Sequence, residues 1–410
     1  MFGKPMKPLD YITIAVAIIF VAAFMVPKIR ENAYWRATVT PLASIIGSGF
    51  LVVAPLLGSV AGSYAVFAMA GIVVLAYAIG GVIRFNILQA ETLEKKPSAP
   101  RGVRTIARFS NMALTIAYVI SVAFYIRLLS SFVLSMTPFK VAIYEDWLAT
   151  SILALIALIG WWRGLKGLEA VETISVSIKL SIIAALIVAL FIHNASTGTW
   201  TANLIADDVD MWTRIRMLAG MLLVVQGFET SRYIGDGYDA QTRHDTMRLA
   251  QISSAMIYVV FVALVVPILV YLPQGKPDET AIISLTGHVA WVLPFLLILA
   301  AFMSQLSAAI ADTVGAGGLV SEETNMKVSS RASYPILIAA SIALIWLFDI
   351  FQVISIASRA FAFYYMMQAG IAFLVAGQKF NGKQKWRHQL WYGFLAIVLA
   401  LIVLFALPAE

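Results

Sequence analysis

Twelve long apolar segments follow one another along the 410-residue chain, separated by short polar stretches. Most are close to the roughly 20 residues that a helix needs to cross the hydrocarbon core of a bilayer. Lipid offers the backbone no hydrogen-bond partner, and the segments are too long and too evenly apolar for barrel strands, so we expect α-helices. The predicted spans are 10–26, 38–58, 63–84, 110–136, 147–162, 168–192, 213–235, 251–272, 289–314, 333–349, 352–376 and 390–408.

The charge content also favours a polytopic membrane protein over any soluble class. Hydrophobic residues make up 61% of the chain and charged residues only 12%, roughly half the charged share of soluble domains. This composition excludes a disordered chain, a coiled coil and an ordinary soluble enzyme. The chain has no cysteine, which excludes disulfides, thiolate metal sites and cysteine catalysis.

Basic residues cluster in alternate loops, and the remaining loops are acidic or neutral. The positive-inside rule places the basic loops in the cytoplasm and explains the net charge of +7. If all twelve segments span, both termini lie outside; if 10–26 lies on the membrane surface, the N-terminus moves inside and the rest keeps its orientation. We expect an integral multi-pass protein of the plasma membrane, the inner membrane of a bacterium, in contact with lipid. The basic loop residues include Lys28, Arg30, Arg36, Arg101, Arg104, Arg108, Arg163, Lys166, Arg243, Lys327, Arg331, Lys379 and Lys385.

Motifs for enzymatic chemistry are missing from the sequence. It contains no phosphate-binding G-x-x-x-x-G-K-[ST] loop, no G-x-S-x-G nucleophile elbow and no H-E-x-x-H zinc motif. The four histidines are not paired at helical spacing, and the basic clusters lack interleaved aromatic residues. We therefore expect no enzyme, no cofactor or metal, and no nucleic-acid partner.

Two predicted spans, 38–58 and 213–235, contain glycine where a continuous helix would not favour it. Glycine in a helix interior costs about 1 kcal/mol relative to alanine, so both patterns predict a break. A break frees the N–H groups of one half-helix and the C=O groups of the other, which suit a carboxylate and a cation. Close helix packing through small residues is the alternative, but a recurrence five spans later favours a binding site in an inverted repeat. The candidate substrate-binding residues are Ile46, Gly47, Ser48, Gly49, Gln226, Gly227, Phe228 and Glu229.

Ionisable residues within the spans are further functional candidates. Placing a charge at membrane depth costs about 2.5–3.5 kcal/mol on insertion scales, so such residues mark functional sites by default. Arg232 follows Glu229 by three residues and could pair with it on a helix. The pair either neutralises itself or serves as a gate or proton relay.

Lys179 lies near the middle of span 168–192, on one helical face with Glu172 and Ser175. It could release and take up a proton, supply a fixed positive charge in place of a sodium ion, or form a structural salt bridge with Glu229 or Asp312. Span 289–314 adds a stripe of small and polar residues, which suits either tight packing or an ion site. The candidate coupling and gating residues are Lys179, Arg232, Ser304, Ser307 and Asp312.

Three motifs, taken in order, resemble the amino acid–polyamine–organocation (APC) transporter superfamily. Residues 45–50 are similar to the Gly-Ser/Thr-Gly-Ile-Phe signature of its broken first helix, with Phe50 where isoleucine is usual. Residues 227–229 resemble the Gly-Phe-Glu of its broken sixth helix, and residues 164–180 its fourth-to-fifth helix segment, which often ends in Lys-Leu.

The resemblance implies a leucine-transporter-like fold, an all-α transmembrane five-plus-five inverted repeat with broken helices 1 and 6 and about twelve spans. Residues 1–37 would form an extra N-terminal span and a cytoplasmic linker. Residues 38–192 would form the first repeat, 213–376 the second, and 390–410 a C-terminal span.

The implied function is secondary active transport of amino acids or related small organic solutes by alternating access, with proton symport or exchange. The amides of Gly47, Ser48 and Gly49 would bind the substrate carboxylate. The carbonyls of residues 225–228 would bind its amine, and Phe228 would pack over the substrate. Lys179 would take the place of the second sodium ion of sodium-coupled relatives.

Two departures from the family pattern keep other functions open. Arg232 within the break is unusual, and residues 237–243 only loosely match the acidic pair and Lys-Asn-Pro-x-Arg that usually follow the sixth helix. These departures motivate an alternative, a transporter of the same fold for an inorganic ion or an organic acid. A membrane sensor or channel is a third hypothesis.

Overall fold

The computed structural model describes residues 6–47, 49–94, 100–165, 169–202, 204, 208–234, 237–272 and 278–409. Within these ranges the regular structure is all helical, as predicted. The helices are α1 (Pro8–Met25), α2 (Pro27–Arg30), α3 (Ala33–Ile45), α4 (Gly49–Ala61), η1 (Gly62–Tyr64), α5 (Ala65–Gln89), α6 (Glu91–Glu94), α7 (Arg101–Leu134), α8 (Ala142–Trp162), α9 (Glu169–Thr197), α10 (Met211–Gly220), η2 (Leu222–Val225), α11 (Thr230–Tyr233), α12 (Ala240–Val265), η3 (Val266–Tyr271), α13 (Ala281–Val289), α14 (Leu293–Glu323), α15 (Ser330–Leu347), α16 (Ile350–Lys379) and α17 (Gly382–Phe405).

Ten helical stretches of the described chain are long and apolar enough to cross a membrane, which supports a multi-pass membrane protein. This is two fewer than the twelve predicted spans, because segments 38–58 and 213–235 each form shorter helices. In the first segment α3 ends at Ile45 and α4 begins at Gly49. In the second, α10 ends at Gly220, the single 3₁₀ segment η2 follows, and the irregular residues 226–229 precede α11.

Several helices begin earlier than their apolar segments. Helix α7 starts at Arg101 rather than at residue 110, and α17 starts at Gly382 rather than at residue 390. The apolar run marks only the part of a helix that suits lipid, whereas the helix itself continues until its terminus is capped. At α12, for example, the side chain of Asp239 accepts a hydrogen bond from the backbone N–H of Thr242 at 2.9 Å.

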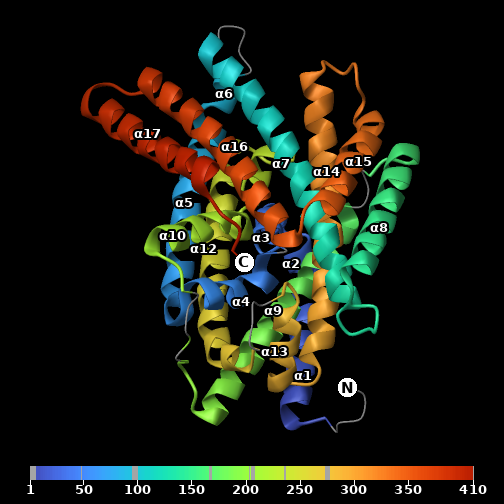
Figure 1. Cartoon of the computed structure of the whole chain (residues 1–410). Coiled ribbons are helices and arrows are strands. Elements are labelled where there is room, and N and C mark those ends of the chain that lie inside the picture. The colour runs from blue at the N-terminus through green and yellow to red at the C-terminus, as the bar shows by residue number, and fades with distance from the viewer. Residues whose placement is uncertain are drawn as a thin grey trace.

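The short helices of the first divided segment lie at the centre of the bundle (Figure 1). Figure 1 shows α3 and α4 in the middle, with α5, α7, α9, α12, α14 and α16 around them. Helix α7 packs against α14 and α16, and α12 packs against α5 and α3. One end of the bundle carries α6 and the connections from α14 to α15 and from α16 to α17, and the other carries α13 (Figure 1).

Helix α1 is fixed to the bundle by one buried carboxylate. It packs along α9, and most of its surface stays exposed and apolar. The Asp10 side chain accepts from the Lys7 backbone N–H at 2.8 Å and from the Val292 N–H, just before α14, at 3.0 Å. Helix α1 has the length and hydropathy of a span, and whether it crosses the membrane stays a prediction.

The last described residues, 406–409, form a strap that returns from α17 into the bundle. Ala406 and Ala409 are buried, and the Leu407 N–H donates to the carbonyl of Arg216 on α10 at 2.9 Å. Arg359 on α16 donates to the carbonyl of Ala406. A Cβ on Gly220 would lie 1.9 Å from the Leu407 carbonyl oxygen, so this close approach requires glycine at position 220.

Candidate functional site

The two divided segments approach each other closely where their regular helices are interrupted, and we call residues 44–47 with 49 and residues 222–229 the crossing segments. A Cβ on Gly49 would lie 2.5 Å from the Val224 Cα, and one on Gly227 would lie 2.4 Å from the Ser44 Oγ. Gly227 also has φ of +116°, a region that side chains disfavour. Close backbone approach therefore accounts for both glycines, as the packing interpretation of the sequence expects.

Tyr258 on α12 joins the crossing segments through its hydroxyl group. Its oxygen lies 2.8 Å from the carbonyl oxygen of Ile45 and 2.6 Å from that of Val224. Both carbonyls belong to helix ends, whose last C=O groups lack intrahelical partners. The ring is fully buried and packs edge-on against Phe50. One tyrosine hydroxyl thus lies within hydrogen-bond distance of the backbone of both divided segments.

Glu229 lies fully inside the protein at the end of the second crossing segment. One carboxylate oxygen, Oε2, accepts from the Gly227 N–H at 3.0 Å and from the Tyr365 hydroxyl at 2.6 Å. The other, Oε1, is buried and has no hydrogen-bond partner in the described structure. Phe228 stacks on the Tyr365 ring with centroids 5.1 Å apart. A buried acceptor without a donor costs about 1–3 kcal/mol, which suits a site completed by a ligand or a proton.

Gln226 supplies a second acceptor near the same centre. Its Nε2 donates to the Tyr125 hydroxyl on α7 at 3.2 Å, while its Oε1 is buried without a described donor. The open positions on Gln226 and Glu229 both accept hydrogen bonds. Such a pair matches a ligand that donates, such as an ammonium group.

Lys179 on α9 reaches the last turn of α3. Its ammonium nitrogen lies 2.7 Å from the Ala43 carbonyl oxygen and 3.3 Å from the Ser304 Oγ on α14. The side chain is buried, and it lines a small cavity of about 50 Å³ together with Ser307 and Asp312. Lys179 therefore bridges three helices with a positive charge.

A second, larger cavity of about 650 Å³ adjoins the first. Asp312, Ser307, Ser175 and Thr230 line both. Along α14 the lining of the larger cavity runs from Phe302 to Glu322, near the last residue of that helix. The cavity thus extends from the level of Lys179 to the end of the bundle that carries the α14–α15 connection.

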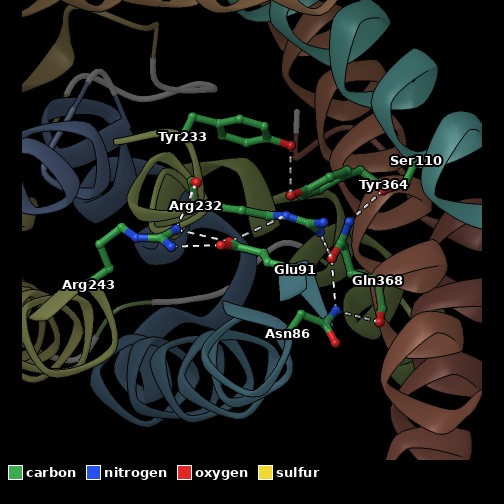
Figure 2. A network of polar contacts seen from close by, with 8 residues as sticks. All are labelled: Asn86, Glu91, Ser110, Arg232, Tyr233, Arg243, Tyr364 and Gln368. Atoms are coloured by element: carbon green, nitrogen blue, oxygen red, sulfur yellow. Dashed lines mark hydrogen bonds and ion pairs between the residues drawn. The ribbon is translucent and has the colours of Figure 1, made fainter. Parts of the chain in front are cut away.

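Arg232 belongs to a polar network with Glu91 and Gln368, drawn in Figure 2. Glu91 on α6 accepts two hydrogen bonds from Arg243, at 2.9 and 2.7 Å, and lies 3.9 Å from the Arg232 guanidinium. Arg243 also donates to the Arg232 backbone carbonyl at 3.0 Å. One carboxylate on α6 is therefore shared by arginines of α11 and α12.

Gln368 on α16 completes this network from the opposite side. Its side-chain oxygen accepts from Arg232 and from Asn86 on α5, and its Nε2 donates to the Ser110 hydroxyl on α7 at 2.7 Å (Figure 2). These contacts connect α11 to α5, α7 and α16. The predicted pairing of Arg232 with Glu229 is replaced by pairing with Glu91, because α11 turns the guanidinium towards α6.

Comparison with known proteins assigns the family. The sequence matches a family described as APC superfamily transporter over residues 27–406. The chain belongs to this superfamily. It is also 44% identical over 404 residues, 98% of each chain, to an uncharacterized protein of Aquifex aeolicus (strain VF5). The predicted APC resemblance is confirmed, and the assignment implies a multi-pass transporter of a small molecule rather than an enzyme.

In this transporter the predicted site residues fall into three places. The substrate-binding candidates lie along the crossing segments, where Gly49 approaches Val224 and Gly227 approaches Ser44. Ser48 and the side chain of Glu172 lie outside the described residues. Neither cavity lining includes the crossing glycines. The second group, beside the cavities, is Lys179, Ser304, Ser307 and Asp312, and Arg232 alone belongs to the network of Figure 2.

Sequence reasoning missed Tyr258, Glu91 and Gln368. Tyr258 is one aromatic residue in an apolar span, where tyrosine is common, and nothing in its local pattern shows which carbonyls it meets. Glu91 follows the predicted span 63–84 and resembles a solvated loop residue. Gln368 could have been singled out from the sequence. It is an uncharged polar residue within the predicted span 352–376, and a polar side chain at membrane depth needs a partner.

Proposed function

We propose that the protein is a secondary active transporter of amino acids or related small organic solutes that works by alternating access. The supporting observation is the position of Lys179, whose ammonium bridges α9, the end of α3 and Ser304 on α14. A coupling cation bound at that place would hold the same three helices together. A lysine does so permanently, which favours proton coupling or solute exchange over sodium symport.

The divided segments support a leucine-transporter-like core. Helices α3 and α4 would form a broken first helix and α10, η2 and α11 a broken sixth, in two five-helix repeats over 38–192 and 213–376. Residues 1–37 would precede this core and 390–410 would follow it. The free acceptors on Gln226 and Glu229 would receive the substrate amine, and the amides of residues 47–49 its carboxylate.

The larger cavity would be the cytoplasmic pathway. It reaches the bundle end where the basic loops gather, among them Arg104, Arg108, Lys327 and Arg331. The positive-inside rule places that end in the cytoplasm of a plasma membrane. The structure would then represent a state in which the inward-facing cavity is formed.

The alternative, a same-fold transporter of an inorganic ion or organic acid, was motivated by Arg232. The contacts of Arg232 with Glu91 and Gln368 give its charge a structural role away from Glu229. This weakens the case for an anion site at the crossing segments. The acceptors left open there favour a ligand that donates hydrogen bonds.

Transport by purified full-length protein in liposomes tests the proposal. We expect uptake of a labelled amino acid, driven by a pH gradient or by a counter-solute inside the vesicles. Lys179→Ala should remove the coupling and Gly49→Leu should abolish uptake by separating the crossing segments. Unchanged uptake in both variants would contradict the mechanism, and stabilisation of the protein by ions alone would favour the alternative.

A further inference from the structure

Asp312 on α14 is a buried acid that lines both cavities. It is only 5% exposed, and it shares the small cavity with Lys179. The larger cavity continues from Asp312 along α14 to Glu322. Among the described residues that line both cavities, Asp312 alone is ionisable. Asp312 is therefore the one described acid at which a proton from the larger cavity can stop beside the cavity of Lys179.

The Ser121 hydroxyl on α7 lies between Asp312 and a backbone carbonyl. Its oxygen is 3.0 Å from the Tyr118 carbonyl oxygen and is also hydrogen-bonded to Asp312 Oδ2. A carbonyl oxygen can only accept, and a serine hydroxyl has a single hydrogen to donate. Both hydrogen bonds therefore form together when Asp312 carries a proton and donates it to the Ser121 oxygen. When Asp312 is ionised, the Ser121 hydrogen is needed by the carboxylate, and the Tyr118 carbonyl loses this donor.

Charged and titratable groups face Asp312 from several elements of the described structure. Lys179 on α9 lines the same small cavity and offers a counter-charge to the ionised carboxylate. Glu229 at the crossing segments is near enough for its negative charge to repel a second one. Asp312 thus lies between one group that attracts its negative charge and one that opposes it. The other titratable groups nearby or in the larger cavity are Tyr118 and Tyr125 on α7, Tyr233 on α11 and Glu322.

We propose that Asp312 carries the coupled proton and exchanges it with water in the larger cavity. This inference rests on the proposed transport function and names the residue that binds its coupling ion. On release, the Asp312 O–H bond breaks, a water molecule takes the proton, and the Ser121 hydrogen turns from the Tyr118 carbonyl to the carboxylate. Lys179 then supplies a counter-charge from the small cavity. Ser121 is a positioning residue, because its hydroxyl responds to whether Asp312 holds the proton.

Solute exchange and proton-driven accumulation are measured separately with the full-length protein in liposomes. In counterflow, unlabelled solute inside the vesicles drives uptake of labelled solute, and no net proton movement is needed. The amide of Asp312→Asn can donate to Ser121 as the protonated acid does, so counterflow should continue. Accumulation driven by a pH gradient, and the proton movement that a dye inside the vesicles reports, should be lost. Asp312→Glu should restore both, and Glu322→Gln, at the far end of the cavity, should retain both.

Infrared difference spectra read the proton on Asp312 without any solute. As the pH is raised, the wild-type protein should lose the C=O stretching band of a protonated carboxylic acid. This band should be missing from Asp312→Asn and present in Glu229→Gln. Ser121→Ala should shift the pH at which the band disappears, because the ionised carboxylate then lacks its hydroxyl donor.

The outcomes separate this inference from the proposed function. Proton-driven accumulation by Asp312→Asn, or an unchanged infrared band in that variant, would overturn the role of Asp312. Loss of counterflow in an Asp312→Asn protein that keeps its thermal midpoint would overturn it too, because Asp312 would then belong to the solute site. Coupling that is lost in Lys179→Gln but kept in Asp312→Asn would assign the proton to Lys179.

Two further results keep the test decisive. If Asp312→Asn does not fold, the infrared band of Ser121→Ala decides, and a band that disappears at the wild-type pH would overturn the proposal. A wild-type protein that transports no amino acid would overturn the proposed function. In that case an infrared band that depends on Asp312 would still support the proton site.

Discussion

The Lys179 ammonium lies 2.7 Å from the carbonyl oxygen of Ala43, in the last turn of α3. The last carbonyls of a helix carry partial negative charge and lack intrahelical donors, so a cation is stabilised there. The Lys179 ammonium group therefore stabilises the C-terminal end of α3.

A requirement for sodium is accordingly not expected. Replacing all sodium with a large organic cation should leave the initial uptake rate in liposomes unchanged, because the Lys179 ammonium nitrogen already contacts the end of α3 and Ser304 on α14. Collapse of the pH gradient in the same vesicles serves as the control for coupled transport. Uptake that stops without sodium would mean that Lys179 does not substitute for a coupling ion.

Gly49→Ala should destabilise the protein by about 1–3 kcal/mol, as overpacking of a filled interior does. The new methyl would meet the Val224 backbone at 2.5 Å, so α4 and η2 must move apart. Gly71→Ala on α5 is the matched control, since nothing lies within 4 Å of its added Cβ. Thermal unfolding in detergent should show a lower midpoint for Gly49→Ala and an equal or higher one for Gly71→Ala. Equal losses in both would rule out a special role for the contact between the crossing segments.

Glu91→Gln should destabilise the protein by about 3 kcal/mol, because it leaves the charge of a buried arginine without its carboxylate. The Arg243 side chain is only 6% exposed. In the pair of Arg108 with Glu323 the arginine is 67% exposed, and Glu323→Gln should cost no more than about 1 kcal/mol. Unfolding of both variants under one set of conditions measures the difference. A larger loss for Glu323→Gln would contradict the assignment of Glu91 as the centre of the network.

Gly220→Ala should displace the strap at 406–409. The Leu407 carbonyl oxygen occupies the place of the new methyl group. That oxygen is a backbone atom and the position of a Cβ is fixed by its own backbone, so no side-chain rotation relieves the clash. The wild-type chain has no cysteine, so a single Ala409→Cys reports on burial of the strap through its rate of maleimide labelling. Labelling should be slow with Gly220 and faster with Gly220→Ala, and Gly102→Ala on α7, with only an ordinary contact at 3.7 Å, should leave it slow. Equal labelling in all three backgrounds would show that the strap is not held by α10.

The membrane-spanning helices could be predicted from the sequence. Each of them must be apolar and form its own backbone hydrogen bonds, whatever its neighbours are. Glycines around residues 47 and 227 also indicated where regular helix ends. The actual helix starts, such as Arg101 of α7, were missed because a helix does not end where its hydrophobic run ends. Hydropathy carries no information on where a polar extension is capped.

The site was less predictable because its contacts join distant residues. Lys179 could be recognised as important from its depth, yet its contact with Ala43 spans 136 positions and depends on how α9 crosses α3. Arg232 was expected beside Glu229 from helical spacing. The four-residue helix α11 is too short for that spacing to decide, and Glu91 on another element binds the guanidinium instead.

The hydroxyl of Tyr258 carries one hydrogen atom, and two carbonyl oxygens lie within hydrogen-bond distance of it. At any moment either Ile45 or Val224 receives that hydrogen, and the other oxygen keeps a lone pair for a different donor. The two divided segments therefore compete for a single proton. A turn of the Tyr258 O–H bond, with no movement of the helices, decides which segment has a vacant acceptor.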